Sequence, residues 1–358
     1  MSESRGLLMF NAVRSAMPTY ADRIPEATRN NIAAVGNAFS TFKVAMNEWV
    51  DTLVNKIGLE LIENFRFGNK AARFEKGRLE AGDTIQDDYI EVLTAMPAVV
   101  PTAGESVDQY EQMPPSVNVG FHRIDRRMVY GVTIWRDWAR EAFHDVNKLD
   151  EFERKVLEVP YQSLNLDKWI MFKELLGSKN IYPTTGESPT KADNAIEVGV
   201  ADSAGTALDQ KATAENLIEA IKNAAKYATQ TVSTDNNRAK VLSSTPPDRL
   251  VLFLRMDWAT VIDFRVLTGL FNLDEARLGV PTIIEVEDFG SSAFMPNQVA
   301  LLADEWAFKI YSTLDGETDT TYNARGRYWN YFIHYWGMMS YSLWGQAIPF
   351  TATPPAGA

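Results

Sequence analysis

The chain of 358 residues contains no cysteine, and this absence excludes several kinds of chemistry at once. Disulfide bonds, thiolate metal ligands and thiol nucleophiles cannot form. A protein that does not use oxidation for its stability suits a reducing cytoplasm. The sequence also lacks a run of about 18 apolar residues, so it predicts no membrane span. Its first residues, MSESRGLLMFNAVRS, hold too short an apolar run for a secretory signal.

Histidine is scarce, and the standard catalytic motifs are missing. His122, His144 and His334 lie in three different segments, and no two have the i, i+4 spacing of a helical metal site. We predict that His334, which lies in an aromatic run, is packed and is not a ligand. Neither a glycine-rich phosphate loop nor a G-x-S-x-G turn occurs. We therefore expect no metal site, no cofactor and no enzymatic activity.

Two acidic patterns resemble sites without meeting their requirements. Asp87 and Asp88 point to opposite faces if their segment is a strand, so they do not make a general acid and base pair. Asp315, Glu317 and Asp319 superficially resemble a calcium loop, but the required glycine and closing glutamate positions are missing. We predict a solvated strand for the first pattern and a polar turn for the second.

Positive charge is also in short supply, with 35 Lys and Arg against 47 Asp and Glu and a net charge of -12. This balance argues against a dedicated nucleic-acid binder, which usually has a basic surplus. Hydrophobic residues at 46% and charged residues at 23% are ordinary for a folded protein. The length allows one elaborated domain or two subdomains.

Helical periodicity is the clearest positive signal. The strongest run extends from Asn147 to Leu176, about 45 Å of helix, and Pro160 predicts a kink or short break in it. An earlier run predicts a helix from about Ile24 to Phe65, and residues 1–21 read as an arm whose order depends on a partner. The apolar stripe of the strongest run contains Leu149, Phe152, Val156, Val159, Leu166, Trp169, Phe172 and Leu176.

Between these helices lies a segment that predicts an extended hairpin. Residues 85–93 and 117–134 have the β-branched and aromatic composition of strands, and a polar tip from Pro97 to Pro115 separates them. Many charges interrupt both runs, which is not typical of a core. An isolated two-stranded hairpin is only marginally stable in water. We therefore expect another molecule to cover it.

The second half predicts a mixed α/β region followed by an aromatic return. Its expected helices begin at Thr213 and at Trp258, the second ending near Leu270. The C-terminal run from Arg327 to Phe350 is dense in aromatic residues. The expected strands are Arg249–Leu254, Ile283–Val286, Val299–Ala303 and Trp306–Tyr311.

Taken in order, these segments resemble the major capsid proteins of tailed bacteriophages with the Hong Kong-97 (HK-97) fold, and among them the phi-29-like podoviruses most. Arg73 to Gln86, RFEKGRLEAGDTIQ, is similar to the family's entry into its extended loop. The spine region is resembled by Ala142–Phe143, Phe152, Asp167–Trp169 and Lys173–Leu176. The closing strand is resembled by Tyr322–Asn323, Asn330–Trp336, Ser340–Trp344 and Ala347–Phe350. The phi-29 protein carries an additional C-terminal immunoglobulin-like domain, whereas this sequence stops soon after Phe350, so we expect closer relatives among shorter capsid proteins.

The resemblance implies an α+β fold with an N-terminal arm, an extended-loop hairpin, a long spine helix, a peripheral (P) domain and an axial (A) domain. The implied division is as follows: arm and first helix 1–65, extended loop 66–134, spine helix 135–182, mainly A-domain 183–298, and return strands of the P-domain with the C-terminal tail 299–358.

The resemblance also implies a structural function, as the major head protein of a short-tailed phage. Copies would assemble in the bacterial cytoplasm as pentamers and hexamers, around double-stranded DNA held by weak non-specific contact. A portal would occupy one vertex. We expect a separate scaffold protein, because only about 20 residues precede the first long helix.

Eight residues of the extended-loop region are the predicted contacts between subunits. Arg123, Arg126 and Arg127 have an alternative role in touching phosphate. The full predicted set is Arg73, Phe74, Lys76, Arg78, Glu80, Arg123, Arg126 and Arg127. Two rival functions remain at this point: an encapsulin-type compartment shell, and an enzyme on a mixed α/β fold that relies on carboxylates alone.

Overall fold

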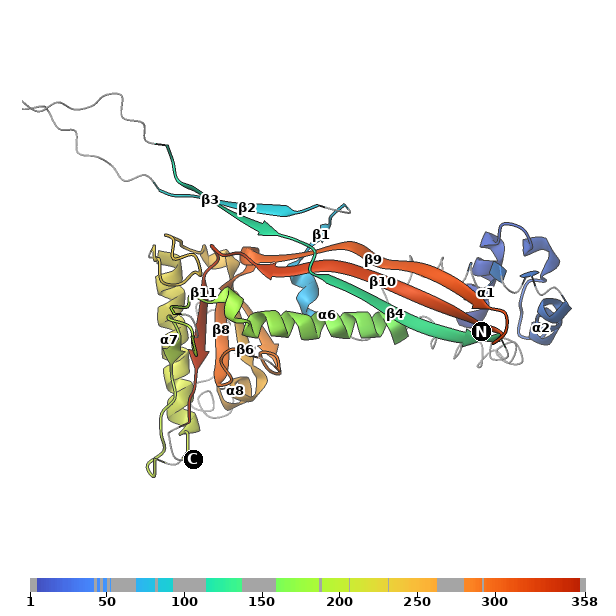
Figure 1. The fold of residues 1–358 in the computed structure, drawn as a ribbon. Helices are drawn as coiled ribbons and strands as arrows, with labels where there is room; N and C mark the ends of the chain where they lie inside the picture. The colour runs from blue at the N-terminus through green and yellow to red at the C-terminus, as the bar shows by residue number, and fades with distance from the viewer. Residues whose placement is uncertain are drawn as a thin grey trace, which may run out of the picture.

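The computed structural model describes residues 5–41, 44–45, 48–49, 52, 69–80, 83–92, 114–136, 159–186, 189–205, 207–230, 232–262, 280–291 and 293–354. Within these ranges the molecule is an elongated α+β structure with two sheets and a projecting hairpin (Figure 1). No helix in the described ranges is long and apolar enough to cross a membrane.

A long, narrow four-stranded sheet forms the elongated part, in the order β1-β9-β10-β4. Its strands are β1 (Glu75–Arg78), β4 (Arg126–Trp135), β9 (Phe308–Asn323) and β10 (Tyr328–Tyr341). β10 pairs antiparallel with both β9 and β4, while the short β1 pairs parallel with β9. Along most of β10, buried and half-buried residues alternate, as expected for a strand with one face on the core.

Helix α6 (Val159–Gly177) lies along this sheet. Tyr161 and Leu164 pack against Ile333 and Tyr335 of β10, which fixes the helix to the strand. Pro160 lies at the start of the described helix, where its missing N–H costs little. The expected helical run before Val159, and therefore the predicted kink, lies outside the described residues.

A five-stranded mixed sheet forms the second unit, in the order β5-β11-β8-β6-β7. α7 (Gln210–Gln230) and α8 (Met256–Val261) pack on one face, while α6 and the 3-10 helix η3 (Lys70–Phe74) pack on the other. β6 and β8 are almost entirely buried, which explains their continuous apolar sequences. The strands are β5 (Ile196–Glu197), β6 (Leu250–Arg255), β7 (Thr282–Val286), β8 (Gln298–Asp304) and β11 (Ala347–Thr351).

The predicted boundary between residues 298 and 299 cuts through this sheet. β8 pairs with β6 on one side and with β11 on the other, so both return segments belong to the second unit. The predicted strands 249–254, 283–286 and 299–303 are confirmed to within a residue or two. Of the predicted helix 258–270, the described part is α8 with Ile262, and the rest lies outside the described residues. Short 3-10 helices complete the unit: η5 (Lys179–Ile181), η6 (Pro247–Arg249) and η10 (Glu305–Ala307).

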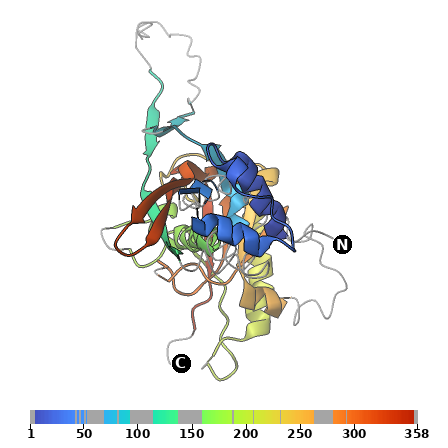
Figure 2. The ribbon, with the colours of Figure 1, turned by 90° about the vertical axis from the view of Figure 1, so that its right-hand side faces the viewer.

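The N-terminal residues form a helical module, not an arm without structure of its own. α1 (Arg5–Ala16), η1 (Ala21–Arg23) and α2 (Ile32–Thr41) pack at one end of the long sheet, as Figure 2 shows end-on. Phe10 and Ile24 are fully buried in a cluster that includes Trp329 and Tyr331 of β10. This contact explains why residues 5–16 are helical: the sheet covers their apolar side. The second helix begins at Ile32 and not at the predicted Ile24.

The hairpin is shorter than predicted. β2 (Ile85–Ile90) pairs antiparallel with β3 (Val117–His122), and this two-stranded sheet projects from the body. The predicted second strand, 117–134, is in fact two strands, because residues 123–125 separate β3 from β4 and β4 pairs with β10. The predicted tip, 97–115, lies almost entirely outside the described residues.

The predicted polar turn at residues 315–319 is wrong. These residues belong to β9 and pair with β10, with Asp319 opposite Phe332 and Glu317 opposite His334. The aromatic partner strand therefore overrides the weak strand propensity of the acidic residues.

Candidate assembly interface

One face of the projecting hairpin exposes apolar side chains to solvent. Val117, Val119 and Phe121 of β3 are 51%, 44% and 61% exposed, and Ile90 of β2 is 63% exposed. Val117 lies opposite Ile90 and Val119 opposite Asp88, so an apolar stripe runs beside an acidic residue. A monomer gains nothing from this arrangement, and exposed apolar patches of this kind mark interaction surfaces.

The other face of the hairpin is attached to the body through one carboxylate, Asp87. Its Oδ2 accepts a short hydrogen bond from the Ser342 hydroxyl, and Lys309 Nζ lies 3.4 Å from its Oδ1. His122 Nε2 lies 3.6 Å from the same carboxylate. Burial alone would raise the pKa of Asp87, but His122, Ser342 and Lys309 together lower it to about 2. Asp87 therefore stays charged and binds β9 and the end of β10. We call Asp87, His122, Lys309 and Ser342 the hairpin anchor.

His122 extends the hairpin anchor along β10. It is 91% buried by its 9% exposure, and its Nδ1 lies 2.8 Å from the Ser340 hydroxyl. A serine, a histidine and an aspartate thus lie in contact, as in a hydrolase. Here, however, Asp87 is held mainly by groups that attach the hairpin, and Ser340 sits within a strand. The geometry serves attachment.

An aromatic pair reinforces the attachment. Tyr89 stacks on Trp344 with ring centroids 5.5 Å apart, and the Trp344 indole nitrogen donates to the Asp87 carbonyl oxygen at 3.4 Å. The Tyr89 hydroxyl also donates to the Leu242 carbonyl oxygen at 2.8 Å. The base of the hairpin is consequently fixed to both sheets, while its exposed face remains available.

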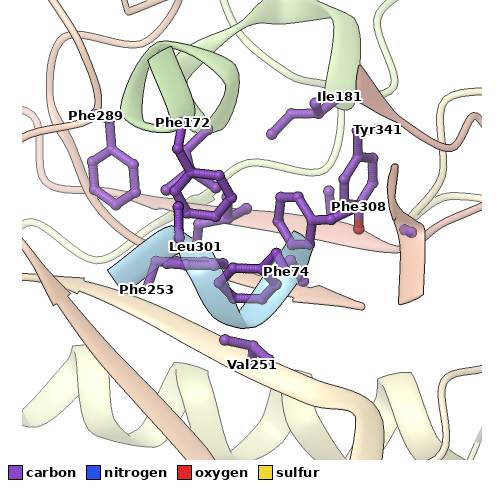
Figure 3. Close-up of a cluster of buried hydrophobic side chains, with 14 of the residues drawn as sticks. Phe74, Phe172, Ile181, Val251, Phe253, Phe289, Leu301, Phe308 and Tyr341 are labelled. Atoms are coloured by element: carbon purple, nitrogen blue, oxygen red, sulfur yellow. The ribbon is translucent and has the colours of Figure 1, made fainter. Parts of the chain in front are cut away.

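Of the eight predicted contact residues, the structure places one in the core. Phe74 is 1% exposed and packs against Phe172, Phe253 and Phe308, with centroids 4.9 to 5.7 Å away (Figure 3). A side chain this deeply buried cannot contact another subunit, so the prediction for Phe74 is wrong. The turn of η3 directs it inward between α6 and the sheets.

The other residues near η3 have partners within the chain. Arg73 makes a two-pronged ion pair with Glu305, at 2.8 and 2.9 Å. Lys76 Nζ donates to the Trp306 carbonyl oxygen at 2.6 Å, and Arg78 Nε to the Thr313 carbonyl oxygen at 2.9 Å. These bonds fasten η3 and β1 to β9.

Glu80 and the second basic group remain more accessible. Glu80 is exposed, and so is Arg123 in the link between β3 and β4. Arg126 lies 3.6 Å from the Asp125 carboxylate, and the Arg127 guanidinium lies 4.7 Å from the centre of the Trp336 ring. The structure does not bring the two basic groups into one patch.

Sequence reasoning missed the most structured part of this region, the hairpin anchor. Asp87 is close to Lys309 and Ser342 only through the fold, because more than 200 residues separate them. The one available signal was a charged residue in a strand next to Asp88, which the sequence alone could not pair. Among the described residues, no group of three or more acidic, histidine or cysteine side chains is placed to hold a metal.

Comparisons with known proteins agree with this architecture. A family model for the Phi29-like phage major capsid protein matches residues 10–351. The major capsid protein of Bacillus phage B103 is 28% identical over 344 residues, covering 96% of this chain and 72% of that protein. The one from Streptococcus phage Cp-1 is 27% identical over 350 residues, covering 94% of this chain and 91% of that protein.

Solved structures give the same fold. The capsid structure of Staphylococcus phage Andhra matches with a TM-score of 0.59 at 13% identity, covering 82% of this chain and 86% of that one. The capsid structure of Cyanophage P-SCSP1u matches with a TM-score of 0.51 at 10% identity, covering 82% and 90%. The fold is thus the HK-97-like capsid fold, and neither the encapsulin nor the enzyme alternative is favoured. By its sequence along nearly its whole length, the chain belongs to the phi-29-like family of phage major capsid proteins, the structural proteins that form the shell of the virion.

Proposed function

We propose that copies of this chain assemble as pentamers and hexamers into a closed head around double-stranded DNA, in the cytoplasm of the bacterial host. In this proposal the four-stranded sheet with α6 is the peripheral domain, and the five-stranded sheet with α7 and α8 is the axial domain. A separate scaffold protein guides assembly, and a portal occupies one vertex.

The observation that carries the proposal is the attached but uncovered hairpin. Its base is held by the hairpin anchor, whereas Ile90, Val117, Val119 and Phe121 are exposed. A two-stranded sheet with an exposed apolar face is stable only when something covers it. In a shell of identical copies, the adjacent subunit is always present to do so.

Deletion of residues 99–114 tests this step. The shortened chain should remain a folded monomer, because the hairpin anchor and both cores are intact, but it should form few particles when expressed with its scaffold. Negative-stain microscopy and sedimentation of the lysate give the readout. Normal particle numbers from the shortened chain would show that the hairpin does not bridge subunits.

Contact with DNA is proposed to be weak. A net charge of -12 per copy cannot provide a uniformly basic lining, and non-specific affinity for DNA depends on basic side chains that displace counterions. Weak contact also suits packaging, because the duplex must slide past the wall. Neutralising Arg123, Arg126 and Arg127 should leave DNA retention unchanged in any particles that form. Normal shells that lose their DNA would assign these arginines to the genome.

A further inference from the structure

The extended hairpin is an acidic arm. Between Leu79 and Phe121 the sequence has eight acidic residues and no lysine, arginine or histidine. Of the described acidic residues on the arm, Asp83, Asp88 and Glu91 are exposed, whereas Asp87 is engaged in the hairpin anchor. The eight residues are Glu80, Asp83, Asp87, Asp88, Glu91, Glu105, Asp108 and Glu111. The arm therefore presents negative charge beside the apolar stripe on β3.

The far end of the long sheet has the opposite character. Arg325 and Arg327 lie in the turn between β9 and β10 and are exposed, and Arg136 follows the end of β4 beside them. The Arg136 backbone N–H donates to the Arg327 carbonyl oxygen at 3.1 Å, which ties the strand ends together. We call Trp135, Arg136, Tyr322, Arg325 and Arg327 the basic tip.

The basic tip is rigid and partly apolar. Asn323 accepts from the Gly326 N–H at 2.9 Å, which fixes the turn, and Arg327 adopts a left-handed backbone with φ of 55°. Trp135 and Tyr322 are 44% and 43% exposed. Aromatic side chains beside arginines are the composition that dominates protein interfaces. Two nitrogens of Arg136, Nε and Nη2, are buried without a hydrogen-bond partner, which leaves its charge poorly compensated.

These two surfaces cannot meet within one copy. The hairpin leaves the body close to the five-stranded sheet and points away from the end of the long sheet where the basic tip lies (Figure 1). Arm and tip also match in kind, since each combines exposed apolar side chains with charges of one sign. A contact between different surfaces of identical copies is heterologous, and such contacts close into rings when the rotation permits.

We propose that the acidic arm of one copy docks on the basic tip of another copy, with the β3 stripe against Trp135 and Tyr322, and with Asp88 and Glu91 near Arg325 and Arg327. This inference rests on the proposed shell function and names the surface that receives the hairpin. It replaces the contacts predicted from Arg73, Lys76 and Arg78, which are engaged within their own chain.

A disulfide between copies tests the contact directly, because the chain has no cysteine of its own. One preparation carries Val119→Cys and a second carries Tyr322→Cys, and the two are co-expressed with scaffold and oxidised. The expected result is a cross-linked dimer that contains one chain of each kind. In the control, Tyr227→Cys replaces Tyr322→Cys, since Tyr227 is 64% exposed on α7, and no such dimer should form.

The outcomes separate the docking from the shell function. Particles without the cross-link would overturn the docking and leave the shell function intact. A cross-link in rings or small oligomers without particles would support the docking and refute the shell function. If neither a cross-link nor particles form, the docking is refuted as well.

Charge reversal gives a second test. Asp88→Lys with Glu91→Lys, or Arg325→Glu with Arg327→Glu, should each lower particle yield roughly tenfold, because weak exposed pairs add over many copies. Mixing the two variants should restore ring formation, since each reversed arm then meets a reversed tip. Arg325→Lys with Arg327→Lys retains the charge and should assemble normally. No recovery on mixing would overturn the pairing, as would normal shells of the tip variant that fail to retain DNA.

Discussion

Asp87→Asn should loosen the hairpin without unfolding the body. The change preserves shape, and Ser342 can still donate to the amide oxygen, but the attraction of Lys309 at 3.4 Å and His122 at 3.6 Å is lost. The fall in the pKa of Asp87 from 3.8 to about 2 corresponds to ~2 kcal/mol, at about 1.4 kcal/mol per pKa unit. Because part of the carboxylate is near solvent, screening reduces the expected cost to about 1 kcal/mol.

The measurement is amide hydrogen exchange of the unassembled chain. A loss of about 1 to 2 kcal/mol should speed exchange in β2 and β3 roughly 5- to 30-fold, whereas β6 and β8 should be unchanged. Asp88→Asn is the matched control, because Asp88 is exposed on the opposite face and contacts Gln86 within the same strand. If Asp87→Asn leaves exchange in β2 and β3 at the wild-type rate, Asp87 does not hold the hairpin.

The same carboxylate sets a pH dependence. Its pKa is lower in the folded state than in the unfolded state, so its stabilising contribution is fully present above pH about 4. The contribution is lost as the pH falls through about 2. Wild-type exchange in β2 and β3 should therefore approach that of Asp87→Asn in strong acid. A constant ratio between the two proteins from pH 6 to pH 2 would contradict this reasoning.

Three further substitutions follow from the cores. Phe74→Ala should cost about 3 to 5 kcal/mol of unfolding free energy, measured by urea denaturation, and a loss under 1 kcal/mol would contradict its burial. Gly177→Ala should yield little soluble protein, because the new Cβ would lie 1.9 Å from the Phe289 carbonyl oxygen; wild-type yield and stability would contradict the close approach. Arg249→Ala should cost about 1 to 3 kcal/mol, because it strands the mostly buried Asp304 carboxylate, whose pKa burial already raises. A urea midpoint unchanged from wild type would show that Asp304 does not depend on Arg249.

Continuous burial and long aromatic runs made parts of the fold predictable. β6 and β8 follow from apolar runs, and the aromatic C-terminal run forms β10 and β11. β9 was mostly missed because Asp and Thr have weak strand propensity, and only its pairing with β10 makes it a strand. Periodicity does not reveal such pairing.

The interface was harder to predict than the fold. Charged residues near η3 suggested contacts with another subunit, but Arg73 meets Glu305 and Phe74 meets Phe308 across more than 200 residues of sequence. The hairpin was predictable from two strand-like runs, whereas its division at residues 123–125 depended on β10 capturing β4. Sequence patterns thus indicated that a partner was needed but not which surfaces meet.

The position of β11 has a consequence for how the protein is made. β11 (residues 347–351) is among the last segments to be synthesised, yet it lies inside the five-stranded sheet, between β5 and β8. The sheet therefore cannot close until translation has nearly finished. A chain interrupted before residue 347 leaves the edge of β8 open and Leu302 uncovered by Ile348. An open edge of this kind invites aggregation and degradation. Interrupted chains are consequently removed before they can be built into a lattice in which one defective copy would weaken all its neighbours.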